Sequence, residues 1–306
     1  MTATSSAPTS YLTAANQMVS AANGIDYAYR EVGDGTPPLV LLQHFRGNLD
    51  NWDRALIDAL ASARQVVTFD NVGVGGSSGT TPSTVAQMAC DAVAFLEAME
   101  LDQVDLLGFS IGSFVAQELV LIRPSLVRRL VLASAAPQGA AGMHGWAQEV
   151  IAGVGKPTFN PEGYLGVFFA PSPASRDAGK QLLGRLAERT DDRDAPATWQ
   201  TRQAQYDAVC AWGIPNHALL QRVSAIDVPV FVANGDSDPM TPALFLSARR
   251  PDPASAREDL PGFGARVPIP VQRRVRCRRR GIPQRRSLIK IARGEAYPTH
   301  ARDPGD

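Results

Sequence analysis

A serine at position 110 has neighbours that suit nucleophilic catalysis. It lies in the pentad GFSIG (residues 108–112), between an apolar run at 104–107 and an amphipathic stretch at 111–122. Glycines on both sides permit a sharp strand-to-helix turn, which holds the serine hydroxyl strained and exposed. At a helix N-terminus the amide of Ile111 could stabilise an oxyanion. We therefore predict a nucleophile at Ser110; the alternative is a Gly/Ser-rich turn without a catalytic role.

A serine alcohol needs a general base, and a third group must orient that base. The apolar run at 228–233 leads into a turn that carries two carboxylates, Asp236 and Asp238. Either could be the orienting acid. For Asp236 the alternative is a turn carboxylate that only accepts backbone amides.

The elements around these residues alternate between strand and helix. Short apolar runs indicate strands buried on both faces, and they lie at 39–43, 66–69, 104–107, 130–133 and 228–233. Amphipathic stretches between them predict helices at 52–63, 84–99 and 111–122. This alternation predicts an α/β fold with a doubly wound, mostly parallel sheet. An alternating run at 25–31 predicts a further strand, with a hairpin turn at 33–35.

Residues 138–220 interrupt this rhythm, because they are helical in tendency and show no clear strand. An insertion at this place would form a lid over the carboxyl edge of the sheet, where open α/β folds bind ligands. We expect a flexible segment at 1–16, a core at 17–137, a helical lid at 138–222, the acid strand and turn at 223–242, and an aberrant Arg/Pro-rich tail at 243–306.

The loop at 43–53 resembles the α/β-hydrolase family, in its esterase and cofactor-free haloperoxidase-like branch. The family usually has His-Gly where this chain has His44-Phe45. The resemblance implies that the Phe45 backbone amide is the second oxyanion donor beside that of Ile111, and that the Phe45 ring narrows the pocket mouth. It implies a loop tether, rather than a base, at His44.

Residues 69–78 (FDNVGVGGSS) match the same family at the turn after the fourth strand. The segment lacks a Walker lysine and does not fit GxGxxG followed by a helix, so we exclude nucleotide binding. We expect its glycines to form a tight turn and Asp70 to accept hydrogen bonds within the loop.

The family resemblance also concerns the acid and the base. The family has a Gly-x-x-Asp turn after the late strand, and this pattern selects Asp238 over Asp236. The family also uses the chain order nucleophile, acid, histidine. That histidine should follow the acid by some 25 residues in a Gly-His context. The chain has four histidines, His44, His144, His217 and His300, and none has this context.

The tail differs from the rest of the chain in charge. From residue 249 onward it carries 15 Lys and Arg against 6 Asp and Glu, although the whole chain has 30 of each. Prolines and arginines replace the periodic apolar pattern. One hypothesis is a functional basic tail that binds nucleic acid or membrane.

A second hypothesis is a reading-frame shift near residues 240–246, which we favour. A codon read one base later takes its first and third letters from fixed positions of the original codons and its middle letter from a wobble base. With permitted wobble bases, residues 260–271 (LPGFGARVPIPV) can be reread as YPDSGHGSLFQY. That string restores the family's Gly-His segment, and its His codon begins inside that of Ala265.

The whole sequence limits the remaining classes. It has no run of 18 apolar residues, no signal-like h-region and only three cysteines, which favours a cytoplasmic protein without transmembrane helices. We expect no cofactor, no metal, no nucleic acid or membrane partner, and a small-molecule substrate. The predicted function is hydrolysis of a small or medium ester-like substrate through Ser110, crippled by loss of the histidine. The alternatives are a non-catalytic binding protein of the same fold, and a nucleic-acid-associated protein that acts through its arginine-rich tail.

Overall fold

The computed structural model describes residues 10–235 and 238–241. Its centre is a seven-stranded sheet with strand order β1-β2-β4-β3-β5-β6-β7. The strands are β1 (Gln17–Ser20), β2 (Asp26–Val32), β3 (Leu39–Leu42), β4 (Val66–Phe69), β5 (Val104–Phe109), β6 (Val127–Ala133) and β7 (Val230–Ala233). β3 to β7 run parallel, while β1 and β2 are antiparallel to their neighbours. The predicted mostly parallel α/β sheet is confirmed.

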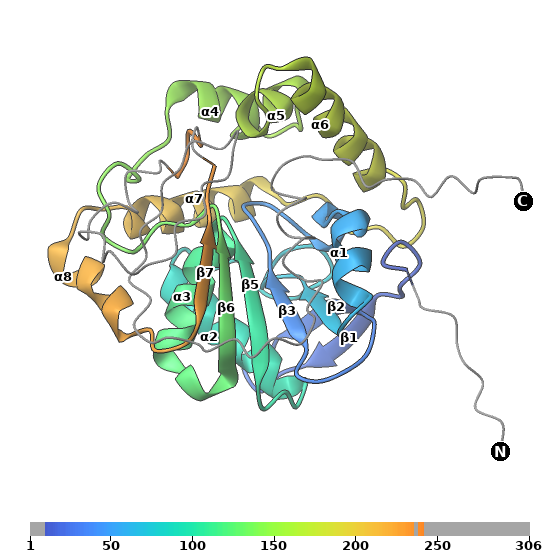
Figure 1. The fold of residues 1–306 in the computed structure, drawn as a ribbon, viewed down its shortest axis with the longest axis vertical. Coiled ribbons are helices and arrows are strands. Elements are labelled where there is room, and N and C mark those ends of the chain that lie inside the picture. Colours follow the sequence, from blue (N-terminus) through green and yellow to red (C-terminus); the bar gives the residue numbers. More distant parts are fainter. Residues whose placement is uncertain (1–9, 236–237, 242–306) are drawn as a thin grey trace, which may run out of the picture.

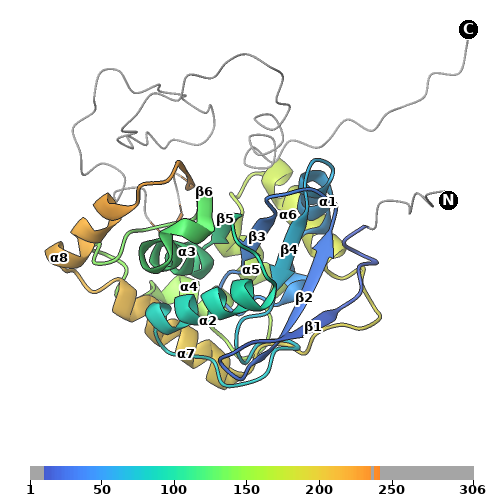
Figure 2. The same cartoon turned by 90° about the horizontal axis from the view of Figure 1, so that it is seen from below.

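Helices cover both faces of the sheet, as Figures 1 and 2 show. They are α1 (Arg54–Ala61), α2 (Val85–Ala98), α3 (Ile111–Ile122), α4 (Gln148–Val154), α5 (Pro161–Phe168), α6 (Pro173–Leu186), α7 (Trp199–Trp212) and α8 (His217–Leu220). Alternate residues of β3 enter different cores: Val40 and Leu42 pack with α2 and α3, whereas Leu39 and Leu41 pack on the side of α1. Two buried faces explain why the strand is apolar throughout.

The chain between β6 and β7 is helical. Helices α4 to α8 lie here, and α7 contacts both α2 and α3. In Figure 1, α4, α5 and α6 lie beyond the carboxyl ends of the strands. None of the helices in the described residues is long and apolar enough to cross a membrane.

Two local expectations differ from the structure. Residues 33–35 join β2 to β3, but these strands do not pair, because β4 lies between them. The segment is therefore no hairpin turn; Gly33 has φ 73°, and a Cβ there would lie 2.4 Å from the Arg64 carbonyl oxygen.

The second expectation is the flexible segment at 1–16, of which residues 1–9 lie outside the described residues. Residues 10–16 pack against the core: Tyr11 is buried and its hydroxyl donates to the Leu49 carbonyl oxygen at 2.8 Å.

Candidate active site

Ser110 lies at the turn between β5 and α3, where it is the N-cap of the helix. Its backbone has φ 55° and ψ −122°, a conformation that costs a non-glycine residue roughly 1–3 kcal/mol. Its hydroxyl makes no capping hydrogen bond, which leaves the oxygen free for a reaction. The turn is held from β6, because the Ser110 amide donates to the Ala133 carbonyl oxygen at 2.9 Å.

The two glycines of the pentad are required by close backbone approaches. A Cβ on Gly108 would lie 2.4 Å from the Gly112 carbonyl oxygen, within α3. A Cβ on Gly112 would lie 2.1 Å from the Leu42 carbonyl oxygen, at the end of β3. The helix can therefore sit against both strands only when these positions carry no side chain. Gly108 and Gly112 therefore allow close packing, and this packing holds Ser110 between them in its strained conformation.

The loop after β3 carries the second predicted oxyanion donor. In the described part of the chain, the Phe45 amide has no backbone or side-chain acceptor, whereas the His44 amide donates to Gln43 Oε1 at 2.9 Å. Ile111 is the first residue of α3, where an N–H group has no partner inside the helix. Both amides are thus available to a developing negative charge.

His44 has local contacts. Its Nδ1 lies 2.9 Å from the Phe45 carbonyl oxygen, and its ring packs edge-on against Phe109 at 5.3 Å between centroids. Burial lowers the pKa of His44, so the ring is neutral near pH 7. These contacts support a tether between the loop and β5. His144 and His217 are both exposed on the lid, and no histidine among the described residues hydrogen-bonds Ser110. His300 lies outside those residues.

The oxyanion loop is clamped from within and from the lid. Gln43 Nε2 donates to the Asn48 carbonyl oxygen at 2.9 Å, across Gly47, whose Cβ would collide with that side chain. On the lid side, the Arg46 amide donates to Oε1 of the buried Gln205 of α7 at 2.6 Å. Arg46 itself has φ 63°. The position of the Phe45 amide therefore depends on α7 as well as on β3.

Asp70 accepts hydrogen bonds at the base of the same loop. Its Oδ1 accepts the Leu49 amide at 2.9 Å and its Oδ2 accepts the Gly76 amide at 2.9 Å. Asp194, after α6, accepts the same Leu49 amide at 3.1 Å. Burial and then the nearby Asp194 raise the pKa of Asp70 well above its usual range, while burial and then Asp50 raise that of Asp194. Two carboxylates that converge on one amide repel each other, which favours the protonated form of one of them.

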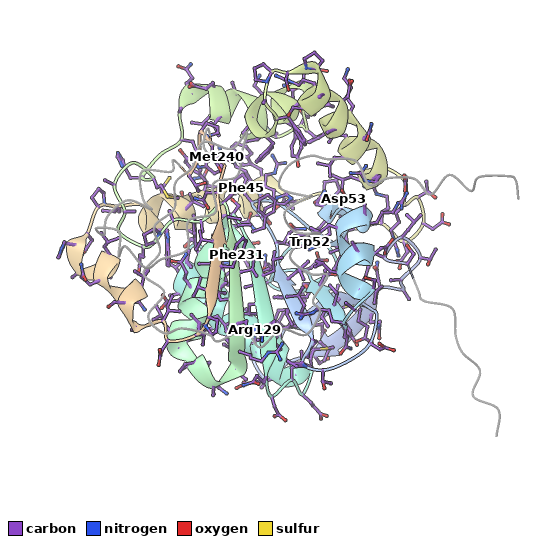
Figure 3. The ribbon with its side chains drawn as sticks, in the orientation of Figure 1. Phe45, Trp52, Asp53, Arg129, Phe231 and Met240 are labelled. Carbon is purple, nitrogen blue, oxygen red and sulfur yellow. The ribbon has the colours of Figure 1, made fainter. Side chains whose placement is uncertain are left out.

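Asp238 follows β7, which is parallel to β6, as β6 is to β5. The sheet therefore brings Ser110 and Asp238 to the same carboxyl edge. Figure 3 shows Met240 and Phe45 at the end of the sheet that faces the lid, and Arg129 near the opposite end. Asp238 Oδ1 accepts the Met240 and Thr241 amides at 2.8 and 3.0 Å, and its Oδ2 accepts the Thr241 hydroxyl at 2.7 Å. Asp236 lies outside the described residues.

The turn that carries Asp238 is tied to β6. The Asn234 side chain donates to the Ala135 carbonyl oxygen and accepts the Ala135 amide, both at 2.8 Å. This pair of bonds fixes the start of the turn against the loop after β6. Asp238 itself accepts two backbone amides and one hydroxyl. These contacts suit a carboxylate that only stabilises the turn as well as an acid that orients a base.

A small cavity lies away from this edge, beside α2. It is lined in part by Phe69, Val72, Met88 and Gln205 and has room for about one water molecule. Ser110, Phe45 and Asp238 do not line it. It is too small to be the reaction site.

Sequence reasoning did not identify the lid residues that face the oxyanion loop. Phe45 packs edge-on against Trp146 at 4.8 Å, and Trp146 against Tyr206 at 5.1 Å. The buried Arg202 lies over the rings of Tyr206 and Trp199, at 4.6 and 4.8 Å. The spacing of positions 199, 202 and 206 places them on one helix face, and this signal was present in the sequence.

Comparison with known proteins gives consistent matches. Residues 37–249 match the alpha/beta hydrolase fold family. A solved alpha/beta hydrolase fold protein from Chitinophaga pinensis is 34% identical, with a TM-score of 0.65, over 74% of this chain and 91% of that one. A Synechocystis protein named as a non-heme chloroperoxidase is 27% identical over 74% of this chain and 83% of its own length.

A Mycobacterium tuberculosis protein named as a non-heme bromoperoxidase, BpoC, is 33% identical over 109 residues. That match covers 35% of this chain and 41% of the relative, so the chain spans about two fifths of its length. The family match is broader. It covers the turn of Ser110 between β5 and α3, which we call the elbow, together with the oxyanion loop and the turn of Asp238. The chain belongs to the alpha/beta hydrolase fold family.

Proposed function

We propose that this chain carries the site of a serine ester hydrolase that acts on small or medium ester-like substrates. Ser110 attacks the ester carbonyl carbon and the alcohol leaves, which gives an acyl-serine that water then hydrolyses. The Phe45 and Ile111 amides hold the oxyanion, and Asp238 orients the base. The observation that carries this proposal is the strained Ser110 between two glycines whose Cβ atoms would strike backbone.

We also propose that the catalytic base of this site is missing. Among the described residues, His44 is tethered to Phe45, and His144 and His217 are exposed. Without a base, the serine keeps its proton and attacks slowly. We propose that the family-type histidine was lost with the reading frame of the tail, so that turnover by this chain is very weak.

The test compares the chain with a version whose tail follows the alternative frame. Hydrolysis of p-nitrophenyl butyrate is measured for both, each with and without Ser110→Ala. The proposal requires activity in the restored version that Ser110→Ala abolishes. Comparable Ser110-dependent turnover in the unrestored chain would show that another base serves, and His300 would be the first residue to replace.

A non-catalytic binding protein is the second candidate. This candidate is favoured because, in the described part of the chain, no histidine hydrogen-bonds Ser110. Absence of ester hydrolysis in both versions, together with saturable binding of an ester that Ser110→Trp blocks, would establish this function instead.

A further inference from the structure

Two arginines lie close together beside the oxyanion loop, one buried and one with solvent-exposed hydrogen bonds. Arg46 belongs to that loop and Arg202 to α7. Their guanidinium groups bind three consecutive carbonyl oxygens after α4: Arg202 Nε donates to Gly155 at 3.2 Å, Arg46 Nη1 to Lys156 at 2.6 Å and Arg46 Nη2 to Pro157 at 3.0 Å. Consecutive carbonyls bring the two cations close together. Burial and then the charge of Arg202 lower the pKa of Arg46.

This pair has no counterion among the residues that the structure describes. Two arginines there are buried, Arg30 and Arg202. Arg30 forms an ion pair with Asp50 at 2.8 Å, whereas Arg202 contacts one carbonyl oxygen, one amide side chain and two aromatic rings. Burial removes the Arg202 cation from water, and the rings and the carbonyl offset only part of that cost. An anion at the Arg46–Arg202 pair would supply the missing countercharge.

The surroundings indicate which kind of anion. A row of rings, Phe45, Trp146 and Tyr206, runs from the oxyanion loop to Arg202. A molecule along this row would place one end at the Phe45 amide and the other at the guanidinium groups. Planar guanidinium suits a carboxylate, which accepts two parallel hydrogen bonds.

We propose that the Arg46–Arg202 pair binds the carboxylate of an ester substrate whose far end is anionic. The assignment of that anion to a substrate rests on the proposed ester hydrolase, whereas its binding does not. Arg46 and Arg202 are then specificity-determining residues, and Trp146 and Tyr206 form the wall along which the substrate lies.

The experiment measures binding without turnover. In a Ser110→Ala background, monomethyl glutarate and dimethyl glutarate are titrated at low salt while tryptophan fluorescence is recorded, because Trp146 and Trp199 lie beside the site. The monoester should bind at least about tenfold more tightly, a difference of about 1.4 kcal/mol. Equal binding of the two esters would overturn the proposal.

Variants separate an anion site from a structural latch. Arg202→Gln should weaken binding of the monoester about tenfold or more and leave the diester unchanged, while Arg202→Lys should give an intermediate affinity because it keeps the charge without the fork. Lys180→Gln removes an exposed lid cation on α6 and should change nothing. If Arg202→Gln fails to fold by circular dichroism, Arg202→Lys and Arg46→Gln decide. Unchanged monoester affinity in the folded variants would leave the pair as a latch for α4.

The two proposals can fail separately. Monoester binding without hydrolysis by the frame-restored chain would refute the esterase and keep the anion site. Hydrolysis of p-nitrophenyl butyrate, with no preference for the monoester in binding, would keep the esterase and refute the anion site.

Discussion

The elbow of Ser110 and the lid above it are held by different means. In α3, ten of twelve residues are buried, whereas only Gly179 is buried in the fourteen residues of α6. β5 pairs with β3 and β6, whereas β7 pairs with β6 alone among the described strands, and Phe231 on β7 is 52% exposed. Backbone packing holds the turn of Ser110, whereas side-chain contacts hold the lid that surrounds it.

Under the proposed function, this contrast would let the chain keep the turn of Ser110 and still lose turnover. The elbow depends on contacts within residues 39–133, which a change after residue 240 does not touch. In the proposed function, the missing base belongs to the segment after residue 242. Four predictions test the contrast, and we take them from the largest expected effect to the smallest.

Restoring the alternative frame after residue 242 should raise ester turnover by on the order of 10⁴–10⁶, the loss typical of a triad that lacks one member. The gain should appear mainly in kcat for p-nitrophenyl acetate and butyrate. A basic tail that evolved for another purpose would give no gain, and the restored chain would then be less stable or insoluble.

Arg30→Met should destabilise the protein by about 3–5 kcal/mol, because it leaves the buried Asp50 without its closest cation. The side chains of this pair are 1% and 2% exposed. The matched pair at the lid, Arg54 with Glu188, is 34% and 36% exposed, and Glu188→Gln should shift the melting temperature by no more than about one degree. Urea unfolding measures the loss in Arg30→Met, and thermal unfolding compares the two variants; equal shifts in melting temperature would refute the contrast.

Gly112→Ala should cost roughly 3 kcal/mol or prevent folding, because the new Cβ meets the fixed backbone of β3. Gly184 is the control: it lies in α6, and a Cβ there has nothing within 4 Å. Gly184→Ala should stabilise by about 0.5–1 kcal/mol through helix propensity. Thermal unfolding of both variants gives the comparison, and a tolerated Gly112→Ala would contradict the close approach of α3 to β3.

The Asp70–Asp194 pair predicts a dependence of stability on pH. Both carboxyl groups have raised pKa values in the folded protein. Above the ordinary carboxyl pKa the folded chain therefore holds more protons than the unfolded chain, so stability falls as the pH rises through the raised pKa. The groups that face the pair are Arg30 and Asp50.

Asp194→Asn should reduce that fall, because burial still raises the pKa of Asp70, and should raise the melting temperature by a few degrees at the alkaline end, with little change in acid. Differential scanning calorimetry from about pH 4 to about pH 9 would show it. Asp177→Asn, at an exposed position of α6, is the control. A parallel shift at every pH would mean that Asp194 does not contribute to the pH dependence.

The sequence alone determined the elements that depend on local pattern. The apolar runs predicted β3 to β7 to within a few residues, and the GFSIG pentad between a strand and a helix predicted the elbow. These succeeded because a strand buried on both faces must be apolar throughout, and a turn this tight admits only small neighbours. The Gly33–Gly35 hairpin failed because the crossover that places β4 between β2 and β3 is a non-local choice.

Only the tertiary structure decided which distant residues meet. It placed Gln205 on the Arg46 amide, Asp194 beside Asp70, and Arg202 beside Arg46. Each of these pairs joins the lid to a core loop more than 100 residues away, and no periodicity within either segment encodes the partner. The sequence specified the turn of Ser110 because its geometry is local, whereas the neighbours of that turn follow from how the lid packs on the carboxyl edge of the sheet.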